Sequence, residues 1–238
     1  MSWVCVVPVK GSAAAKSRLG DLPEPFPARG ALAEAFALDT VAALLASASV
    51  HRVLVVTNDP AAAAPLAALG AQIVPELPQT SPSDAANGRH EATRDPLNAA
   101  IAEGVRVAQE LYPQRNLAVL TGDLPALTTA DVETALTAAS AHDRAMIADE
   151  EGTGTTTLLA LAGVSLTPRF GPGSRAAHEG AGHVPLNLPA SASIRRDVDT
   201  VDNLAEVLRR GVGAHTSAII ARSQLAPDAA DSRPPESL

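Results

Sequence analysis

Short runs of apolar residues alternate along this chain with longer segments that are apolar at helical spacing. The runs 3–9, 51–56 and 117–120 consist mainly of apolar, often β-branched residues, which is typical of strands buried on both faces of a parallel sheet. Between the first two runs, residues 29–47 are apolar nearly all round and favour a buried helix. The alternation of strand and helix predicts an α/β fold, a mostly parallel sheet with right-handed crossovers and helices on both faces.

Polar residues mark where several helices begin. Asp59 before Pro60 and Asp95 before Pro96 each combine an N-cap residue with proline at the first helical position. The first pair predicts a short helix over 61–69. The second predicts a helix with one buried face, formed by Leu97, Ile101, Val105, Ala108 and Leu111.

Weaker patterns follow in the rest of the chain. Thr128-x-x-Asp131 predicts a capping box for a helix that ends near residue 140. A final helix is expected from Asp202 to Gly211. Short strands are expected at 72–74, 145–148, 158–162, 184–188 and 193–194, with residues 155–157 in a polar turn.

Two segments resemble neither helix nor strand. Residues 78–94 are rich in Ser, Pro, Asn and Gly and predict a long surface loop. Residues 223–238 predict a polar tail. We therefore expect a single domain over 1–212 and a C-terminal segment over 213–238, partly helical and then disordered.

Composition narrows the function classes. The chain has 238 residues, of which 46% are hydrophobic and 18% charged, which suits a globular enzyme with a sizeable core rather than a disordered chain. A net charge of -8 would repel a polyanion such as DNA, so nucleic acid is not an expected partner. A few well-placed Lys and Arg residues could still hold a small anion.

Single residues add further expectations. Cys5 has no second cysteine to pair with and lies in an apolar run, so we expect it in the core. Lys10 interrupts that run before a signal-peptide pattern can form, and the most apolar long segment, 31–50, contains acidic residues. We therefore expect a cytoplasmic protein that does not interact with a membrane. The histidines show no metal spacing, and His178 and His183 are expected at the surface.

Asp123 is the first candidate for a functional residue. It follows the buried run 117–120, and the carboxyl ends of strands are where open α/β sheets bind ligands. Asp197 and Asp199 alternate near a later strand end, so one of them could pair with Asp123 around Mg²⁺, which prefers hard carboxylate oxygens. The alternatives are that Asp123 only caps the next helix, and that Asp199 or Thr200 caps the last one.

The segment after the first strand contains three cations and a glycine: Lys10, Gly11, Lys16 and Arg18. Such a segment suits a loop that cradles phosphates. It is not a P-loop, because the glycine before the lysine is missing and the spacing is one residue short. Solvated surface lysines are the alternative.

Two later segments also offer polar groups to a ligand. Asn98 lies in the first turn of its helix, with its amide expected to be free for a ligand. The segment 169–175 combines two glycines, a serine and the start of a short helix, an arrangement that suits a phosphate group. A neutral first-turn asparagine and a plain turn are the respective alternatives.

Six segments in chain order resemble the guanylyltransferases of the deazaflavin coenzyme (F-420) pathway. They read PVKGSAAAKSRL, DPLNAAI, GDLPAL, EEGTGTTTLLAL, FGPGSRAAH and DVDTVDNL, and the resemblance covers roughly residues 2–212. This family comprises 2-phospho-L-lactate guanylyltransferases in archaea and phosphoenolpyruvate guanylyltransferases in actinobacteria. It implies a nucleotide-diphospho-sugar-transferase-like fold, and a reaction in which GTP and a three-carbon phosphate give a guanylated product and diphosphate.

The resemblance also implies roles for single residues. The triphosphate would be bound by Lys10, Gly11, Lys16 and Arg18, with Lys16 and Asp123 as the catalytic residues. Asn98 would belong to the guanosine site, although Pro96 stands where relatives often have glycine. Mg²⁺ would be bound by Asp123, Asp197 and Asp199, and the three-carbon phosphate by Thr156, Gly171 and Ser174.

The resemblance leaves substrate and partners open. An alanine-rich composition suggests an actinobacterial source and therefore phosphoenolpyruvate, with 2-phospho-L-lactate as the alternative. A molybdopterin nucleotidyltransferase is a more remote alternative, because its glycine-rich first loop is absent. A non-catalytic nucleotide-binding subunit would be expected to have lost acids or lysines that this chain keeps. A homodimer, or handover of product to the next enzyme, is expected among the possible partnerships.

Overall fold

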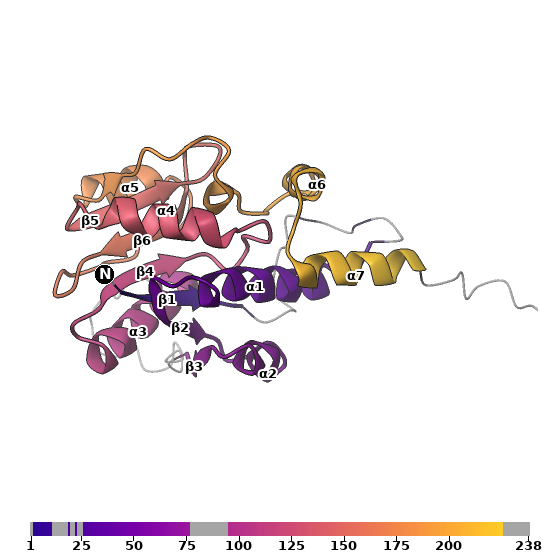
Figure 1. Cartoon of the computed structure of the whole chain (residues 1–238), viewed down its shortest axis with the longest axis horizontal. Helices are drawn as coiled ribbons and strands as arrows, with labels where there is room; N and C mark the ends of the chain where they lie inside the picture. The colour runs from indigo at the N-terminus through magenta and orange to yellow at the C-terminus, as the bar shows by residue number, and fades with distance from the viewer. Residues whose placement is uncertain (1, 11–18, 20–21, 23–25, 77–94, 226–238) are drawn as a thin grey trace, which may run out of the picture.

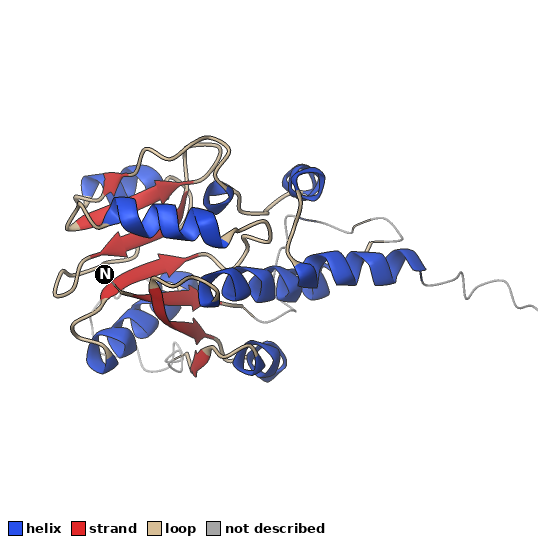
Figure 2. Ribbon diagram, viewed as in Figure 1, coloured by secondary structure: helices blue, strands red, loops and turns tan. Residues whose placement is uncertain are grey.

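A seven-stranded sheet with helices on both faces forms the body of the protein (Figures 1 and 2). The computed structural model describes residues 2–10, 19, 22, 26–76 and 95–225. The strand order is β3-β2-β1-β4-β6-β5-β7. In chain order the elements are β1 (Trp3–Pro8), α1 (Arg29–Leu45), β2 (Val50–Val56), α2 (Pro60–Ala68), β3 (Gln72–Val74), α3 (Pro96–Leu111), β4 (Asn116–Leu120), α4 (Thr129–Ala139), β5 (Arg144–Ala148), β6 (Thr155–Ala160), α5 (Ser174–Gly180), β7 (Val184–Pro185), the 3-10 helix η4 (Ser193–Arg195), α6 (Val201–Arg210) and α7 (Ala214–Leu225).

The central strand β1 packs against helices on both of its faces, and this packing explains its uninterrupted apolar sequence. Trp3, Cys5 and Val7 enter the core beneath α1, α2 and α4, and Val4 and Val6 enter the core beneath α3. β1 pairs in parallel with β2 and β4, as the pattern predicts. Burial raises the pKa of the Cys5 thiol to about 12, so this residue is the inert core cysteine that its position indicated.

Helix α3 approaches the sheet closely because of one glycine. A Cβ atom at Gly104 would lie 2.5 Å from the side chains of Val6 and Val56, a separation that no side chain could tolerate. Asp95 caps this helix as predicted, since its carboxylate accepts a hydrogen bond from Leu97 N at 3.0 Å. The predicted apolar face is correct except at Leu111, which is 53% exposed at the last position of the helix.

Strand β6 departs from the parallel pattern, since it pairs antiparallel with both β4 and β5. The expected polar turn at 155–157 is wrong, because Thr155, Thr156 and Thr157 form the buried first half of this strand. Threonine is β-branched and fits a strand once its hydroxyl finds a partner. Because β6 runs opposite to β4, its first residues lie beside the last residues of β4, where the candidate ligand groups gather.

Three other expectations in this region need correction. The strand predicted at 193–194 is the 3-10 helix η4, and the strand predicted at 184–188 is limited to Val184–Pro185. Thr128 does cap α4, accepting a hydrogen bond from Asp131 N at 3.2 Å. The Asp131 carboxylate does not complete a capping box, however, because it accepts a bond from Ser193 N at 2.7 Å instead.

The C-terminal helix α7 lies alongside α1 (Figure 1). Asp39 of α1 is 5% exposed, and its carboxylate accepts hydrogen bonds from His215 N and Thr216 N, both at 2.9 Å. α1 therefore supplies the cap for a helix that begins more than 170 residues later. The boundary expected after residue 212 remains a prediction, and the loop expected at 78–94 and the end of the tail lie outside the described residues.

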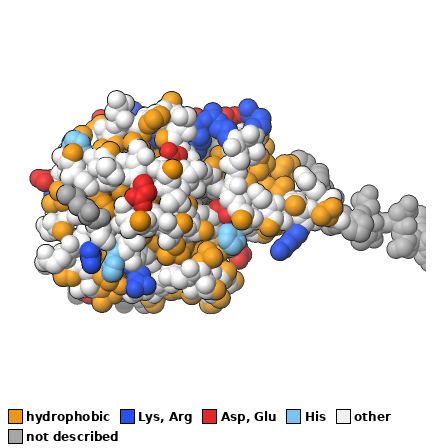
Figure 3. All heavy atoms as spheres, viewed as in Figure 1, with side chains coloured by type: hydrophobic (Ala, Val, Ile, Leu, Met, Phe, Trp, Pro, Cys, Tyr) orange, Lys and Arg blue, Asp and Glu red, His pale blue; other side chains and the backbone are white. Residues whose placement is uncertain are grey.

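Basic side chains gather on the surface over α6. Lys and Arg side chains are seen there in Figure 3, and Arg209 and Arg210 of that helix both pair with Glu206. No helix in the part of the chain that the structure describes is long and apolar enough to cross a membrane.

Candidate active site

Asp123 lies at the carboxyl edge of the sheet, just beyond β4. Its turn is held by one main-chain bond, in which Thr121 N donates to Thr156 O at 3.0 Å, and by one side chain, since Leu124 N donates to the buried Thr40 hydroxyl at 3.1 Å. A Cβ atom at Gly122 would lie 3.1 Å from Pro8 O, so glycine lets this turn press against the end of β1. Asp123 does not cap the next helix, because Thr128 does.

Asp197 and Asp199 come to the same place. Val198 N donates to Asp123 O at 3.1 Å, which fixes the segment 197–199 against the β4 turn. One carboxylate oxygen from each of the three aspartates lies within 4.8 Å of the other two. Both later aspartates join Asp123, and not one alone. Residues two apart on an extended chain lie on the same face, so their spacing does not separate them. The cap of α6 is Thr200, whose hydroxyl accepts a bond from Asn203 N at 3.2 Å.

The electrostatics of this acidic cluster favour a cation. Burial, together with the nearby carboxylates of Asp123, Asp199 and Asp149, raises the pKa of Asp197 to about 8. A divalent cation among these oxygens would relieve the repulsion, and three carboxylates supply the hard oxygen ligands that Mg²⁺ prefers. The residues therefore fit a magnesium site.

The end of β1 brings one predicted cation close in the fold to this cluster. Lys10 is exposed and follows β1 by two residues, and the preceding Pro8–Val9 segment is the one that Gly122 touches. Gly11, Lys16 and Arg18 lie outside the described residues, so their phosphate-binding roles remain predictions.

A second group of polar residues surrounds the start of α5, which begins at Ser174 within the segment 169–175, where a short helix was expected. Ser174 is 2% exposed and its N–H donates to Gly171 O at 3.0 Å. Thr156 is fully buried, and its hydroxyl donates to Ile194 O at 2.7 Å. Because a hydroxyl has one proton, Thr156 cannot donate to a phosphate while it makes this bond.

The loop 149–154 joins the two groups, and the sequence interpretation assigned no role to its first residue. The Asp149 carboxylate accepts hydrogen bonds from Thr153 N at 3.0 Å and Gly154 N at 2.7 Å, which closes the loop on itself. Arg195 donates to Asp149 O at 3.1 Å, and Arg175 donates to Gly152 O at 3.0 Å. An aspartate before a Gly-Thr-Gly segment is the signal that could have identified this turn.

Three side chains that were expected to be exposed or open to a ligand are hydrogen-bonded within the protein instead. Asn98 Nδ2 donates to Phe170 O at 2.9 Å, and Asn98 Oδ1 accepts from Phe170 N at 2.8 Å, so its amide is not free. The expectation of surface positions for His178 and His183 is wrong, since both are buried. His178 bonds to Thr155 and to the backbone of Arg169, and His183 bonds to Ala145 O. These partners are distant in sequence or irregular in spacing, so no local pattern reveals them.

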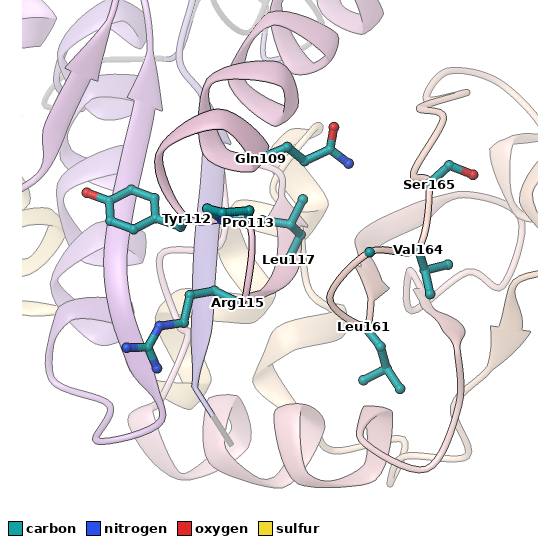
Figure 4. Close-up of a pocket in the computed structure, with 9 residues that line it drawn as sticks. Gln109, Tyr112, Pro113, Arg115, Leu117, Leu161, Val164 and Ser165 are labelled. Carbon is teal, nitrogen blue, oxygen red and sulfur yellow. The ribbon is translucent and has the colours of Figure 1, made fainter.

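A separate pocket opens at the other end of β4 (Figure 4). It lies between the C-terminal end of α3, with Tyr112 and Arg115, and the turn that carries Val164 and Ser165. Leu117, at the start of β4, lines it, whereas Asp123 follows the end of the same strand. This pocket is therefore distinct from the acidic cluster.

Comparison with known proteins identifies the family to which this chain is similar. Residues 31–186 match the family model of the MobA-like NTP transferase domain. A phosphoenolpyruvate guanylyltransferase of Streptomyces scabiei is 48% identical over 222 residues, which are 93% of this chain and 97% of that protein. One of Streptomyces coelicolor is 44% identical over 226 residues, which are 95% of this chain and 99% of that protein.

Solved structures show the same fold at low sequence identity. A protein of Desulfovibrio desulfuricans described as a nucleotide-diphospho-sugar transferase superposes with a TM-score of 0.63 at 17% identity, covering 94% of this chain and 96% of that one. A 4-diphosphocytidyl-2C-methyl-D-erythritol synthase superposes with a TM-score of 0.54 at 13% identity, covering 88% of this chain and 97% of that one. The chain belongs to the MobA-like NTP transferases and, among them, to the family of the phosphoenolpyruvate guanylyltransferases.

Proposed function

We propose that this protein transfers GMP from GTP to the phosphate of phosphoenolpyruvate, releases diphosphate, and thereby serves deazaflavin coenzyme (F-420) synthesis. The observation that carries the proposal is the convergence of Asp123, Asp197 and Asp199 at the carboxyl edge of the sheet, within 4.8 Å of one another. The relatives' names supply the choice of substrate.

The reaction is an in-line displacement at phosphorus. An oxygen of the acceptor phosphate forms a bond to the α-phosphorus of GTP, and the bond from that phosphorus to the leaving diphosphate oxygen breaks. The acceptor oxygen is already anionic, so the reaction needs positioning and charge neutralisation more than a strong base.

Two sets of residues would supply those two requirements. Asp123, Asp197 and Asp199 would hold Mg²⁺, which when bound neutralises charge on the phosphates. Lys10, with the predicted cations Lys16 and Arg18, would stabilise the departing diphosphate. Ser174 and the backbone at Gly171 would hold the acceptor phosphate.

The nearest alternative acceptor is 2-phospho-L-lactate. It is tetrahedral at its second carbon, whereas phosphoenolpyruvate is planar there, so a pocket could discriminate between them by shape, though only modestly. A molybdopterin nucleotidyltransferase would share the MobA-like domain, and a non-catalytic subunit would share the nucleotide site. The retained acidic cluster argues against the second of these.

Diphosphate release from each NTP, measured with and without each acceptor, tests the proposal. We expect release only with GTP, Mg²⁺ and a three-carbon phosphate, and faster release with phosphoenolpyruvate than with 2-phospho-L-lactate. Faster turnover of 2-phospho-L-lactate would reverse the choice of acceptor. Equal use of ATP, or no dependence on either acceptor, would contradict the proposed reaction.

A further inference from the structure

The loop 169–173 before α5 is held at two successive residues by side chains that lie outside it. The Asn98 amide bonds to both backbone groups of Phe170, at 2.8 and 2.9 Å. The His178 ring accepts a bond from Arg169 N at 2.9 Å. We call Asn98 and His178 the loop clamp.

Asn98 reaches the loop from another layer of the fold. It lies in the first turn of α3, 72 residues before Phe170, and a third bond from Nδ2 to Asp95 Oδ2 at 3.1 Å fixes its amide to the helix cap. The pairing with Phe170 reproduces the two-bond exchange between facing residues of an antiparallel sheet. It uses the acceptor oxygen of Asn98 and directs its Nδ2 donors to protein oxygens.

His178 bonds to the loop from within α5, and its bonds define its protonation. Because Nε2 accepts from Arg169 N, the proton of the neutral ring is on Nδ1, which donates to the Thr155 hydroxyl at 2.9 Å. Burial, His183 and Arg169 lower the pKa of His178 to about 4, so Nε2 remains an acceptor at neutral pH. The ring also packs edge-on against Phe170, with ring centroids 5.2 Å apart.

The clamp bonds involve residues that lie next to, or one helical turn from, the residues proposed to bind the acceptor phosphate. Phe170 precedes Gly171, and His178 follows Ser174 by one turn within α5. Phe170, Ser174 and His178 are buried while Gly171, Pro172 and Gly173 between them are exposed. The loop is therefore fixed at its two ends and presents its middle to solvent.

We propose that Asn98 and His178 are positioning residues that hold the loop 169–173 in the shape that receives the phosphate of the three-carbon acceptor. The inference rests on the proposed function for the identity of that ligand. This proposal assigns Asn98 to the acceptor half of the site rather than to the guanosine half. Neither residue touches a reacting atom, so their loss should weaken acceptor binding and leave nucleotide binding unchanged.

The test compares Asn98→Leu and His178→Phe with the control His183→Phe. His183 is a buried histidine of the same cluster, with its ring 5.7 Å from that of His178, but its bond goes to Ala145 O in β5 rather than to the loop. We expect the two clamp variants to raise KM for phosphoenolpyruvate roughly ten- to a hundredfold, because misplaced binding groups lose much of their effect. KM and Kd for GTP should change less than about twofold in all three variants.

Conservative variants separate the bonds from general packing. His178→Gln keeps an acceptor near the Nε2 position and should recover most of the acceptor affinity that His178→Phe loses. Asn98→Asp keeps the acceptor for Phe170 N but loses the donor, and should fall between Asn98→Leu and the native protein. These milder changes also serve if the apolar variants fail to fold.

Three results would overturn the inference. Loss of GTP affinity in Asn98→Leu, with acceptor KM unchanged, would return Asn98 to the nucleotide. An equal rise in acceptor KM in His183→Phe and His178→Phe, at equal thermal stability, would reduce His178 to a packing residue. A failure of His178→Gln to improve on His178→Phe would exclude the bond to Arg169.

The outcome does not depend on which acceptor the native protein uses. If it guanylates 2-phospho-L-lactate instead, the proposed acceptor is wrong, but the same rise in KM is expected for that compound. Hydrogen exchange is independent of turnover altogether. The amides of Arg169 and Phe170 should exchange at least tenfold faster in the corresponding clamp variants, since each loses its acceptor, and unchanged exchange would contradict the clamp.

Discussion

The two halves of the candidate site are held in place by different kinds of bond. The acidic turn is held mainly by main-chain bonds, from Thr121 N to Thr156 O and from Val198 N to Asp123 O, with one side-chain acceptor, the Thr40 hydroxyl. The acceptor loop relies on side chains, the amide of Asn98 and the ring of His178. A half built on main-chain bonds tolerates substitution of its neighbours, whereas a half built on side-chain bonds can be weakened by single substitutions away from the ligand.

Loss of Asp123 should have the largest effect. Asp123→Asn removes a charge from the metal-binding group without changing the main-chain bonds that hold the turn. We expect turnover with Mg²⁺ to fall roughly a hundred- to a thousandfold, by analogy with the loss of one preorganised charge-stabilising group, with the melting temperature nearly unchanged. Diphosphate release, Mn²⁺ binding and thermal melts measure this, with the exposed Asp202→Asn as the control. Native activity in Asp123→Asn would remove the residue from the site.

Ser174→Ala tests the acceptor half directly. A hydrogen bond to a charged group contributes about 1.5–3 kcal/mol, so kcat/KM for the acceptor should fall roughly ten- to a hundredfold. KM for GTP should remain unchanged, since the triphosphate is expected at the other half. An unchanged kcat/KM would place the acceptor phosphate elsewhere.

Thr40→Val tests whether the acidic turn depends on any side chain. The buried Thr40 hydroxyl donates to Phe36 O at 2.8 Å and accepts from Leu124 N at 3.1 Å. Valine has nearly the same shape but leaves Leu124 N without its partner, which costs about 1–3 kcal/mol of unfolding free energy. Chemical denaturation measures the loss, and Thr40→Ser should retain most of the stability. A Mg²⁺ requirement that rises with the loss would show that the acidic half also depends on one distant side chain.

The smallest expected effect is a pH dependence confined to the acceptor half. The pKa of His178 is about 4 in the folded protein, below its usual 6.5, because of burial and the neighbouring His183 and Arg169. A depressed pKa means that the unfolded chain takes up the proton first, so the stability from this group is lost as pH falls from about 6.5 towards 4. The decline should be shallower in His178→Phe than in the native protein, as measured by denaturation at several pH values. Equal slopes in the two proteins would contradict the low pKa.

The sequence predicts the acidic half better than the acceptor half for a physical reason. Buried parallel strands such as β1 and β4 are apolar without interruption, and the aspartate at the end of β4 is visible in a local window. The family resemblance names all three aspartates, whereas the local pattern supports only one of Asp197 and Asp199 beside Asp123. Their meeting at one place depends on the irregular segment after η4.

The acceptor half depends on contacts between residues that are too far apart in sequence to appear in one local pattern. The pairing of Asn98 with Phe170 spans 72 residues, and the antiparallel direction of β6 is decided by its neighbours in the sheet. Thr155 and His178 are polar and are therefore expected at the surface, but both are buried and hydrogen-bonded to each other. Polarity alone therefore predicts exposed positions for two residues that are buried.

The cap that Asp39 provides for α7 has a consequence for how the chain matures during synthesis. Asp39 is made early, and its hydrogen-bond donor His215 N follows 176 residues later. At the usual rate of about 5–20 residues per second, the carboxylate waits roughly 10–35 s for that partner. Until α7 leaves the ribosome, this flank of α1 carries a charge that cannot be buried favourably. Helix α1 therefore reaches its final environment only after α7 has been translated.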